Sequence, residues 1–377
     1  MSDSATETRE LESHSFELDT AYDHIEGLNN KTPLLPFGIV HQNGYSVNLH
    51  IKMDTLNQGG SFKDRGSEYF IHKAVKFGKL NPGDTIVTAS AGNHGKGTAR
   101  AGKSHGLNLI LYMPKITPLI KIEGAKDLGA KIELVEGSYH DAALAAQSFA
   151  EQHDHVYVPA YDHPDIILGQ STVTTEALMQ LFWQNLEPDF FIYPFGGGGL
   201  ANGGGFTLQK KAGRKVYAYG VQAHNFDTMF RSFRKGELMD YVNRGDTIAD
   251  GIRVPHASQT MLNLSLKYLD DMFDITEDQL KDAIRRVYTS EFLTQLQLLP
   301  TEELETNHGF YSNHKEGVPR MNIIEGAAAA SFACAFSKDK IPYEDLVRKL
   351  GKKELTGVII ASGNNIDSKL LEEILEE

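Results

Sequence analysis

The chain has 377 residues, 41% hydrophobic and 23% charged, so it can form two lobes with a sizeable core, and its composition is ordinary for a soluble globular protein. Its formal net charge of −13 argues against nucleic acid or an anionic membrane as a partner. Cys334 is the only cysteine, which excludes an intrachain disulfide and favours a reducing compartment.

The first segment, residues 1–28, is acidic and polar and contains no apolar stretch of the kind found in signal peptides. This composition predicts a flexible or loosely docked N-terminal arm. No apolar run in the sequence is long enough to cross a membrane, and we therefore expect a cytoplasmic protein without membrane contact.

Short apolar runs alternate with helix-length stretches over most of the remaining chain. The predicted strands are residues 47–53, 84–88, 108–113, 131–135, 155–159, 190–194, 215–221 and 358–361. The predicted helices between them include residues 61–77, 93–105, 119–128, 139–152 and 164–183. This alternation predicts an α/β fold with twisted, mostly parallel sheets covered by helices. The run 84–159 alternates most tightly and predicts a compact small lobe, while its flanking segments would build a larger one.

Two stretches interrupt this rhythm. Residues 222–256 contain few strand signals, and residues 300–321 are polar and loop-like. His308 and His314 lie in the second stretch, but their spacing does not fit a metal-binding pair on one helix face. A solvated loop is the better interpretation of residues 300–321.

A run of glycines follows the predicted buried strand 190–194. Gly196, Gly197, Gly198 and Gly199 precede a helix-compatible segment that begins at Leu200. Consecutive glycines allow the backbone N–H groups to converge on an anion at a helix N-terminus. The spacing matches neither the dinucleotide fingerprint nor a P-loop, so a monophosphate fits better than a nucleotide. The alternative is a tight strand-to-helix turn without a ligand.

Lys63 lies in the segment Ser61-Phe62-Lys63-Asp64-Arg65-Gly66, where it is either a solvated helix charge or a buried amine. A buried lysine has a lowered pKa and can form a Schiff base with an aldehyde and then act as a base.

The segment from Ser90 to Gly95 follows a predicted strand and opens a predicted helix. Free N–H groups at a helix start bind carboxylates, and Asn93 can donate to a phenolate oxygen on a cofactor ring. The alternative is simple helix capping by Ser90. Ser362 follows a late predicted strand, where a hydroxyl can face a pyridine nitrogen without forcing its protonation, which suits elimination better than transamination.

Together these segments offer an amine, a carboxylate site, a phosphate cradle and a partner for a pyridine nitrogen, which are the groups that a pyridoxal 5′-phosphate site needs. Residues 61–66 resemble the Schiff-base segment of threonine dehydratases and threonine synthases, and residues 90–94 and the four glycines resemble those of dehydratases and serine racemases. Residues 32–34, 169–172, 247–251 and 325–327 are also similar to dehydratase segments. The chain is identified as resembling the threonine/serine dehydratase branch of the fold type II (tryptophan synthase β-like) pyridoxal phosphate enzymes, over about residues 30–368.

The resemblance implies a role for each segment. Lys63 would hold the cofactor and Asn93 would contact its ring oxygen. The phosphate would be held by Gly196, Gly197, Gly198, Gly199 and Leu200, and the pyridine nitrogen by Ser362. The substrate carboxylate would be bound by Ser90, Ala91, Gly92, Asn93 and His94. The implied small lobe is residues 85–162, and the large lobe is residues 29–84 and 163–377. The implied reaction is β-elimination from L-threonine or L-serine, which gives ammonia and 2-oxobutanoate or pyruvate.

Several departures from the family keep alternatives open. Ala91 stands where serine racemases have a second serine, which argues against efficient racemisation. Gln222 and Thr228 replace the acidic metal ligands of some relatives, so we predict no metal. Asp64 weakly favours a threonine synthase-like or other β- or γ-replacement enzyme, and a catalytically silent amino-acid- or cofactor-binding protein is the alternative of another class. Few residues follow Asn365, so we expect no regulatory domain there. We expect a homo-oligomer acting on a small amino acid.

Overall fold

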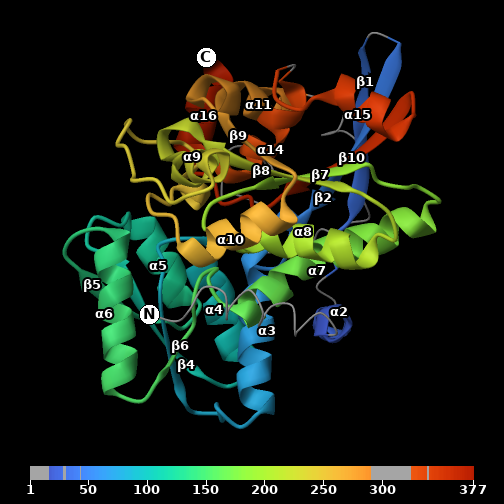
Figure 1. The fold of residues 1–377 in the computed structure, drawn as a ribbon. Helices are drawn as coiled ribbons and strands as arrows, with labels where there is room; N and C mark the ends of the chain where they lie inside the picture. Colours follow the sequence, from blue (N-terminus) through green and yellow to red (C-terminus); the bar gives the residue numbers. More distant parts are fainter. Residues whose placement is uncertain (1–16, 29–30, 43, 290–323, 338) are drawn as a thin grey trace, which may run out of the picture.

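The computed structural model describes residues 17–28, 31–42, 44–289, 324–337 and 339–377, and these residues form two sheets (Figure 1). The larger sheet has six strands in the order β1-β2-β10-β7-β8-β9. Its strands are β1 (Leu34–Gln42), β2 (Tyr45–Met53), β7 (Phe190–Pro194), β8 (Tyr217–Ala223), β9 (Asp271–Ile275) and β10 (Glu354–Ala361). All neighbours are parallel except β1 and β2. The predicted α/β class with mostly parallel sheets is therefore confirmed.

The smaller sheet has four parallel strands in the order β5-β4-β3-β6. Its strands are β3 (Thr85–Ala89), β4 (Asn108–Pro114), β5 (Lys131–Val135) and β6 (Val156–Tyr157). All four strands lie within residues 85–162, the range that we propose as the small lobe. Figure 1 shows this sheet below the larger one, with α3, α4 and α7 near the junction.

Helices cover both faces of each sheet, because successive side chains of a strand point to opposite faces. On β7, Phe190 and Ile192 pack into one core, and Phe191 and Tyr193 pack into the other. The first core also takes side chains from α11 (Glu277–Thr289), α14 (Gly326–Phe336), α15 (Tyr343–Leu350) and α16 (Ser368–Glu376). The second takes them from α2 (Glu17–Gly27), α7 (Pro164–Trp183), α8 (Gly199–Lys211), α9 (Thr228–Lys235) and α10 (Gln259–Tyr268).

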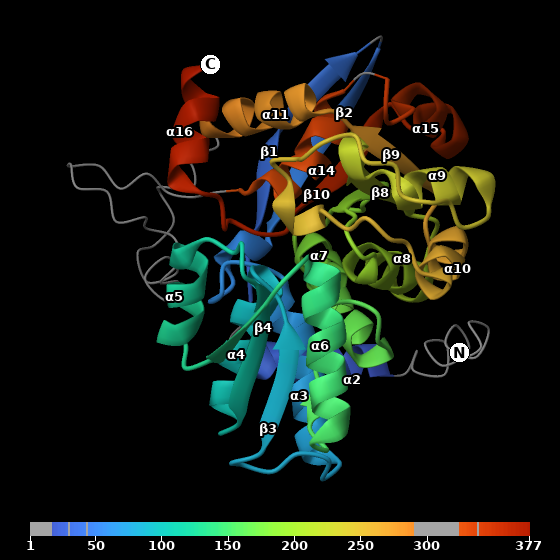
Figure 2. The same cartoon turned by 90° about the vertical axis from the view of Figure 1, so that its left-hand side faces the viewer.

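The smaller sheet is covered in the same way. One face packs against α3 (Lys63–Lys76), α4 (Asn93–Ser104) and α5 (Leu119–Asp127), and the other packs against α6 (Tyr139–Gln152). Figure 2 shows α5 and α6 on either side of this sheet. Short 3-10 helices, η1 (Asp54–Leu56), η2 (His224–Phe226) and η3 (Asp250–Ile252), lie in the connections.

The structure differs from the predictions at the two edge strands of the larger sheet. The sequence of β1 contains Pro36 and Gly38, which disfavour a strand, and the pairing register shifts between these two residues. An edge strand pairs on one side only and so tolerates such an interruption. In β9, Asp271 and Asp274 obscure the apolar pattern, as charged residues commonly do on edge strands.

The N-terminal segment is also more ordered than predicted from residue 17 onward. Leu18, Ala21, Tyr22 and Ile25 are buried along one side of α2, which packs against α7. Their spacing is that of an amphipathic helix, and this apolar face overrides the acidic composition of the segment. Within residues 222–256 the structure shows α9 and two 3-10 helices rather than a continuous loop. The predicted loop 300–321 lies outside the described residues.

Candidate active site

The structure brings the Lys63 and Ser362 segments side by side. Phe62 N–H donates to the carbonyl oxygen of Ser362 at 3.0 Å, and Ser61 and Gly363 form an isolated β-bridge. Ser362 is buried directly after β10, and Lys63 is the first residue of α3. Two segments almost 300 positions apart (362 − 63 = 299) therefore share one edge of the larger sheet.

Lys63 is held at this edge by its backbone and by its amine. Its Nζ donates to the carbonyl oxygen of Ala160 at 2.6 Å. A Cβ added at Gly97 on α4 would lie 3.0 Å from the carbonyl carbon of Lys63, so the two helices approach closely because residue 97 has no side chain. Desolvation lowers the pKa of Lys63 to about 8. A substantial fraction of this amine is therefore neutral near physiological pH, which nucleophilic attack and proton abstraction both require.

The four glycines form a cradle at the start of α8. Gly198 is the N-cap residue and has φ +94°, a left-handed conformation that favours glycine, and no side chain caps the helix. A Cβ at Gly197 would lie 2.2 Å from the ring of Tyr161, and one at Gly199 would lie 2.4 Å from Gln170 Oε1. The uncapped N–H groups at the start of α8 are suited to an anion.

The turn from Ser90 to Gly92 connects β3 to α4 without a side-chain cap on the helix. Ser90 Oγ accepts from Gly92 N–H at 3.1 Å, so the hydroxyl stabilises the turn rather than capping α4. Ala91 and Gly92 are half-buried. The first N–H groups of α4 are therefore left for a ligand or solvent, as the carboxylate-loop prediction requires.

His94 differs from the other members of the predicted carboxylate loop because its imidazole is occupied inside the protein. The ring nitrogen Nε2 lies 2.9 Å from Thr88 Oγ1, and Nδ1 lies 3.5 Å from Ser67 Oγ. Burial and the nearby charge of Lys63 lower the pKa of His94 to about 3, so the ring is neutral. Only the backbone of His94 can take part in carboxylate binding.

Asn93 belongs to a polar cluster that sequence reasoning did not assemble. Its Nδ2 donates to Glu325 Oε1 at 2.8 Å, and its Oδ1 accepts from Asn365 Nδ2. Glu325 Oε2 accepts from Asn365 N–H at 3.0 Å. Burial, reinforced by Asp250, raises the pKa of Glu325 to about 7. The cluster fixes the side chain of Asn93 between the start of α4 and the segment after β10.

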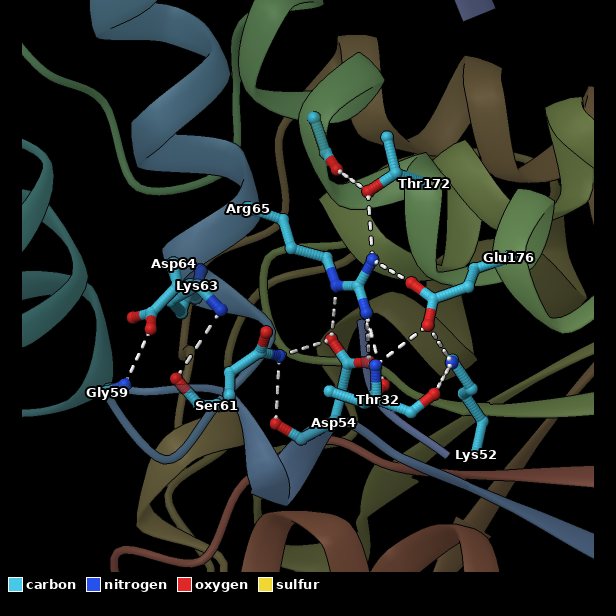
Figure 3. Close-up of polar contacts among 12 residues, drawn as sticks. Thr32, Lys52, Asp54, Gly59, Ser61, Lys63, Asp64, Arg65, Thr172 and Glu176 are labelled. Carbon is cyan, nitrogen blue, oxygen red and sulfur yellow. Dashed lines mark hydrogen bonds and ion pairs between the residues drawn. The ribbon is translucent and has the colours of Figure 1, made fainter. Parts of the chain in front are cut away.

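A buried ionic network fixes the first turn of α3 (Figure 3). Arg65 makes a bidentate pair with Asp54, with both N–O distances 2.9 Å, and its Nη1 lies 2.7 Å from Glu176 Oε2. Lys52 Nζ lies 2.7 Å from Glu176 Oε1, so two cations face two carboxylates. Thr32 joins the network by donating from its hydroxyl to Asp54 Oδ1 at 2.8 Å. Because Arg65 is two residues from Lys63, the network anchors the segment that carries the amine.

The network also sets the protonation of its carboxylates. Burial alone would raise the pKa of Glu176, but the charges and hydrogen bonds of Arg65 and Lys52 lower it to about 2. The ionised pairs and their hydrogen bonds compensate for the burial of these charges. The sequence signal was present only as isolated charges on segments distant in the chain.

Three residues near Lys63 and the glycine cradle were not assigned a role from the sequence. Ala160 and Tyr161 lie just before α7, and Gln170 is a buried residue of α7. Gln170 was noted only within a segment that resembles dehydratases, and Ala160 and Tyr161 carry no motif. Their positions depend on how α7 packs against α3 and α8, which the sequence does not reveal.

The positions that bind a metal in some relatives are used differently in this chain. Gln222 Oε1 accepts from Phe230 N–H at 2.8 Å. Asp227 Oδ1 pairs with Arg231 at 2.8 Å and with Arg244 at 2.6 Å. The part of the chain that the structure describes contains no group of three or more His, Cys, Asp or Glu residues suited to a metal ion. It likewise contains no helix that is both long and apolar enough to span a membrane.

The residues present fit pyridoxal phosphate. The glycine cradle offers uncapped N–H groups where any added Cβ would collide with neighbours. Gln170 Oε1, beside the cradle, is buried and has no hydrogen-bond partner among the described residues, as expected of an atom that faces a ligand or water. Lys63 supplies an amine with a lowered pKa.

Comparisons with known proteins agree with this fit. The profile of the family described as "Pyridoxal-phosphate dependent enzyme" matches residues 25–294. The chain is 29% identical to L-threonine ammonia-lyase of Thermotoga maritima over 87% of this chain and 70% of that protein. It is 29% identical to the biosynthetic L-threonine dehydratase IlvA of Pasteurella multocida over 74% of this chain and 53% of that protein. The chain thus spans about half the length of that relative.

The fold is also similar to a solved structure. The processed form of threonine deaminase isoform 2 from Solanum lycopersicum superposes with a TM-score of 0.72 and 25% identity, over 98% of this chain and 88% of that chain. The resemblance read from the sequence and the pyridoxal phosphate cofactor are both confirmed by these comparisons.

Proposed function

Because the chain belongs to the pyridoxal-phosphate dependent enzyme family, we propose that it is an L-threonine/L-serine ammonia-lyase that releases 2-oxobutanoate or pyruvate and ammonia. The observation that carries the proposal is the meeting of the Lys63 amine, the glycine cradle and the Ser362 segment at one edge of the larger sheet. The names of the relatives support the choice of threonine.

In this proposal each residue has a defined task. Lys63 holds the cofactor covalently and, once released, moves a proton at the substrate Cα. The N–H groups from Gly196 to Leu200 hold the phosphate, and Ser362 faces the pyridine nitrogen. The cofactor supplies an electron sink that stabilises negative charge at Cα.

The remaining predicted residues orient the substrate. The N–H groups at Ser90–His94 bind the α-carboxylate, and Asn93, held by Glu325, faces the ring oxygen of the cofactor. Ala91 offers no proton donor on the face opposite Lys63, and this supports elimination over racemisation.

The synthase-like alternative loses support from the structure. Asp64 Oδ2 accepts from Gly59 N–H at 2.6 Å, and Arg100 Nε lies 3.9 Å from the same carboxylate. Burial raises the pKa of Asp64 to about 6. These contacts give Asp64 a structural task, in which it closes the turn before α3, so its presence need not signal replacement chemistry.

The test is product analysis of the purified protein incubated with a panel of β- and γ-substituted amino acids. We expect 2-oxobutanoate from L-threonine and pyruvate from L-serine, with K63A inactive. Absence of turnover with every substrate would favour the silent binding protein, and a replacement product would favour the synthase-like alternative. The lobe boundaries, the homo-oligomer and the cytoplasmic location remain parts of the proposal.

A further inference from the structure

The carbonyl oxygen of Ala160 accepts two hydrogen bonds at the candidate active site. Lys63 Nζ donates to it at 2.6 Å, and Gln170 Nε2 donates to it at 3.3 Å. A carbonyl oxygen has two lone pairs, so these two donors satisfy it completely. One of the donors is the amine that must leave in order to bond to the cofactor.

Gln170 is fixed in this position by two glycines. A Cβ at Gly66 on α3 would lie 2.9 Å from Gln170 Cγ, and a Cβ at Gly199 on α8 would lie 2.4 Å from Gln170 Oε1. The side chain, which is 1% exposed, thus passes between the Lys63 helix and the phosphate cradle. Few other conformations are open to it in a close-packed interior.

We propose that Gln170 is a positioning residue that holds the Ala160 carbonyl as the resting place of the Lys63 amine and keeps this carbonyl hydrogen-bonded when the amine leaves. The proposal rests on the proposed function, because it requires Lys63 to bond to the cofactor. It adds a role for Ala160, whose backbone receives the amine again whenever the substrate displaces it.

The covalent step balances without another reactant. The ammonium of Lys63 gives one proton to solvent, and the neutral nitrogen adds to the aldehyde carbon of the cofactor. A carbon–nitrogen double bond forms, and the aldehyde oxygen leaves as water. The nitrogen then no longer donates to Ala160, and Gln170 Nε2 is the donor that remains. Without Gln170 the carbonyl would lose both partners, and an unsatisfied buried acceptor is costly.

The test compares two ligands that differ only in whether they can bond to Lys63. Pyridoxal 5′-phosphate has the aldehyde, whereas pyridoxine 5′-phosphate has an alcohol and leaves the amine on Ala160. Their dissociation constants are measured on the apoprotein by calorimetry, with visible absorbance as a second signal for the aldehyde. The readout is the ratio of the two constants.

Q170M keeps the length of the side chain and removes the donor. We expect it to weaken binding of the aldehyde about tenfold, which corresponds to about 1.4 kcal/mol, and to change alcohol binding less than about twofold. Q180M is the matched control on the same helix. Gln180 Nε2 also donates to a carbonyl that a lysine shares, Thr32 O with Lys52, but away from the cradle, so Q180M should leave the ratio unchanged.

Each outcome decides the proposal. A ratio unchanged in Q170M, or equal losses for both ligands, overturns it, because Gln170 would then have no role or would only shape the cradle. Q170E serves if Q170M does not fold. Its charge weakens both ligands through their phosphate, and the ratio should still shift about tenfold. If the unaltered protein shows no aldehyde-specific absorbance, the proposed function itself fails, and this inference fails with it.

Discussion

Replacing Gly198 with alanine should weaken cofactor binding strongly while the fold is retained. Gly198 has φ +94°, and a Cβ there would lie 2.6 Å from Phe195 Cζ, on a ring that is fully buried. A non-glycine residue in such a conformation costs about 1–3 kcal/mol, and overpacking a core costs about 1–3 kcal/mol more. The loop can relieve about 2–4 kcal/mol of this strain by moving away from the phosphate position. Cofactor affinity would then fall by about 30- to 1,000-fold.

Gly213 provides the matched control for this prediction. It has φ +70° just beyond the other end of α8, and a Cβ there would meet no atom within 4 Å. G213A therefore carries the backbone strain without the collision and away from the cradle. Cofactor titration by absorbance and chemical denaturation of the apoprotein should be run on both variants. If G198A binds the cofactor as well as G213A does, the glycine run is only a turn and our reasoning about the cradle is refuted.

Three other predictions concern the amine, the substrate face and the buried network. Reconstitution of the apoprotein should accelerate as pH rises toward about 8 and then level off, because the pKa of Lys63 is lowered to about 8 and only the neutral amine attacks; stopped-flow absorbance would show a flat profile if this is wrong. A91S should raise D-serine formation from L-serine, measured by chiral chromatography, and rapid D-serine formation by the unaltered protein would contradict the argument. E176Q should lower the free energy of unfolding by about 3–5 kcal/mol because it leaves Arg65 and Lys52 undercompensated, and a loss below about 1 kcal/mol in denaturant titration would contradict this. Because the pKa of Glu176 is lowered to about 2, its stabilisation is complete above about pH 5 and is lost as pH falls toward 2.

The sequence predicted the segments of the site because each has a local signature. Gly196–Gly199 directly follows a buried strand, Ser362 also ends a strand, and Lys63 begins a helix. Since the carboxyl ends of parallel strands share one edge of a sheet, their meeting followed from the predicted fold.

The sequence did not predict contacts that depend on packing between distant elements. Lys52 and Glu176 are 124 positions apart, and a solvated charge is the ordinary expectation for each of them alone. The side chain of His94 was expected to face the substrate, but the spacing of the motif does not show that Thr88 and Ser67 occupy its ring. Gln170 gains its significance only from the two glycines on other helices that pack against it.

The identity of the lysine that bonds to the cofactor tests the central claim most directly. The purified protein is loaded with pyridoxal phosphate, reduced with borohydride, digested and mapped by mass spectrometry. We predict that the reduced cofactor is found on Lys63 and that K63A carries none. Labelling of another lysine, such as Lys96 on the adjacent helix α4, with Lys63 unmodified, would contradict the assignment of this site.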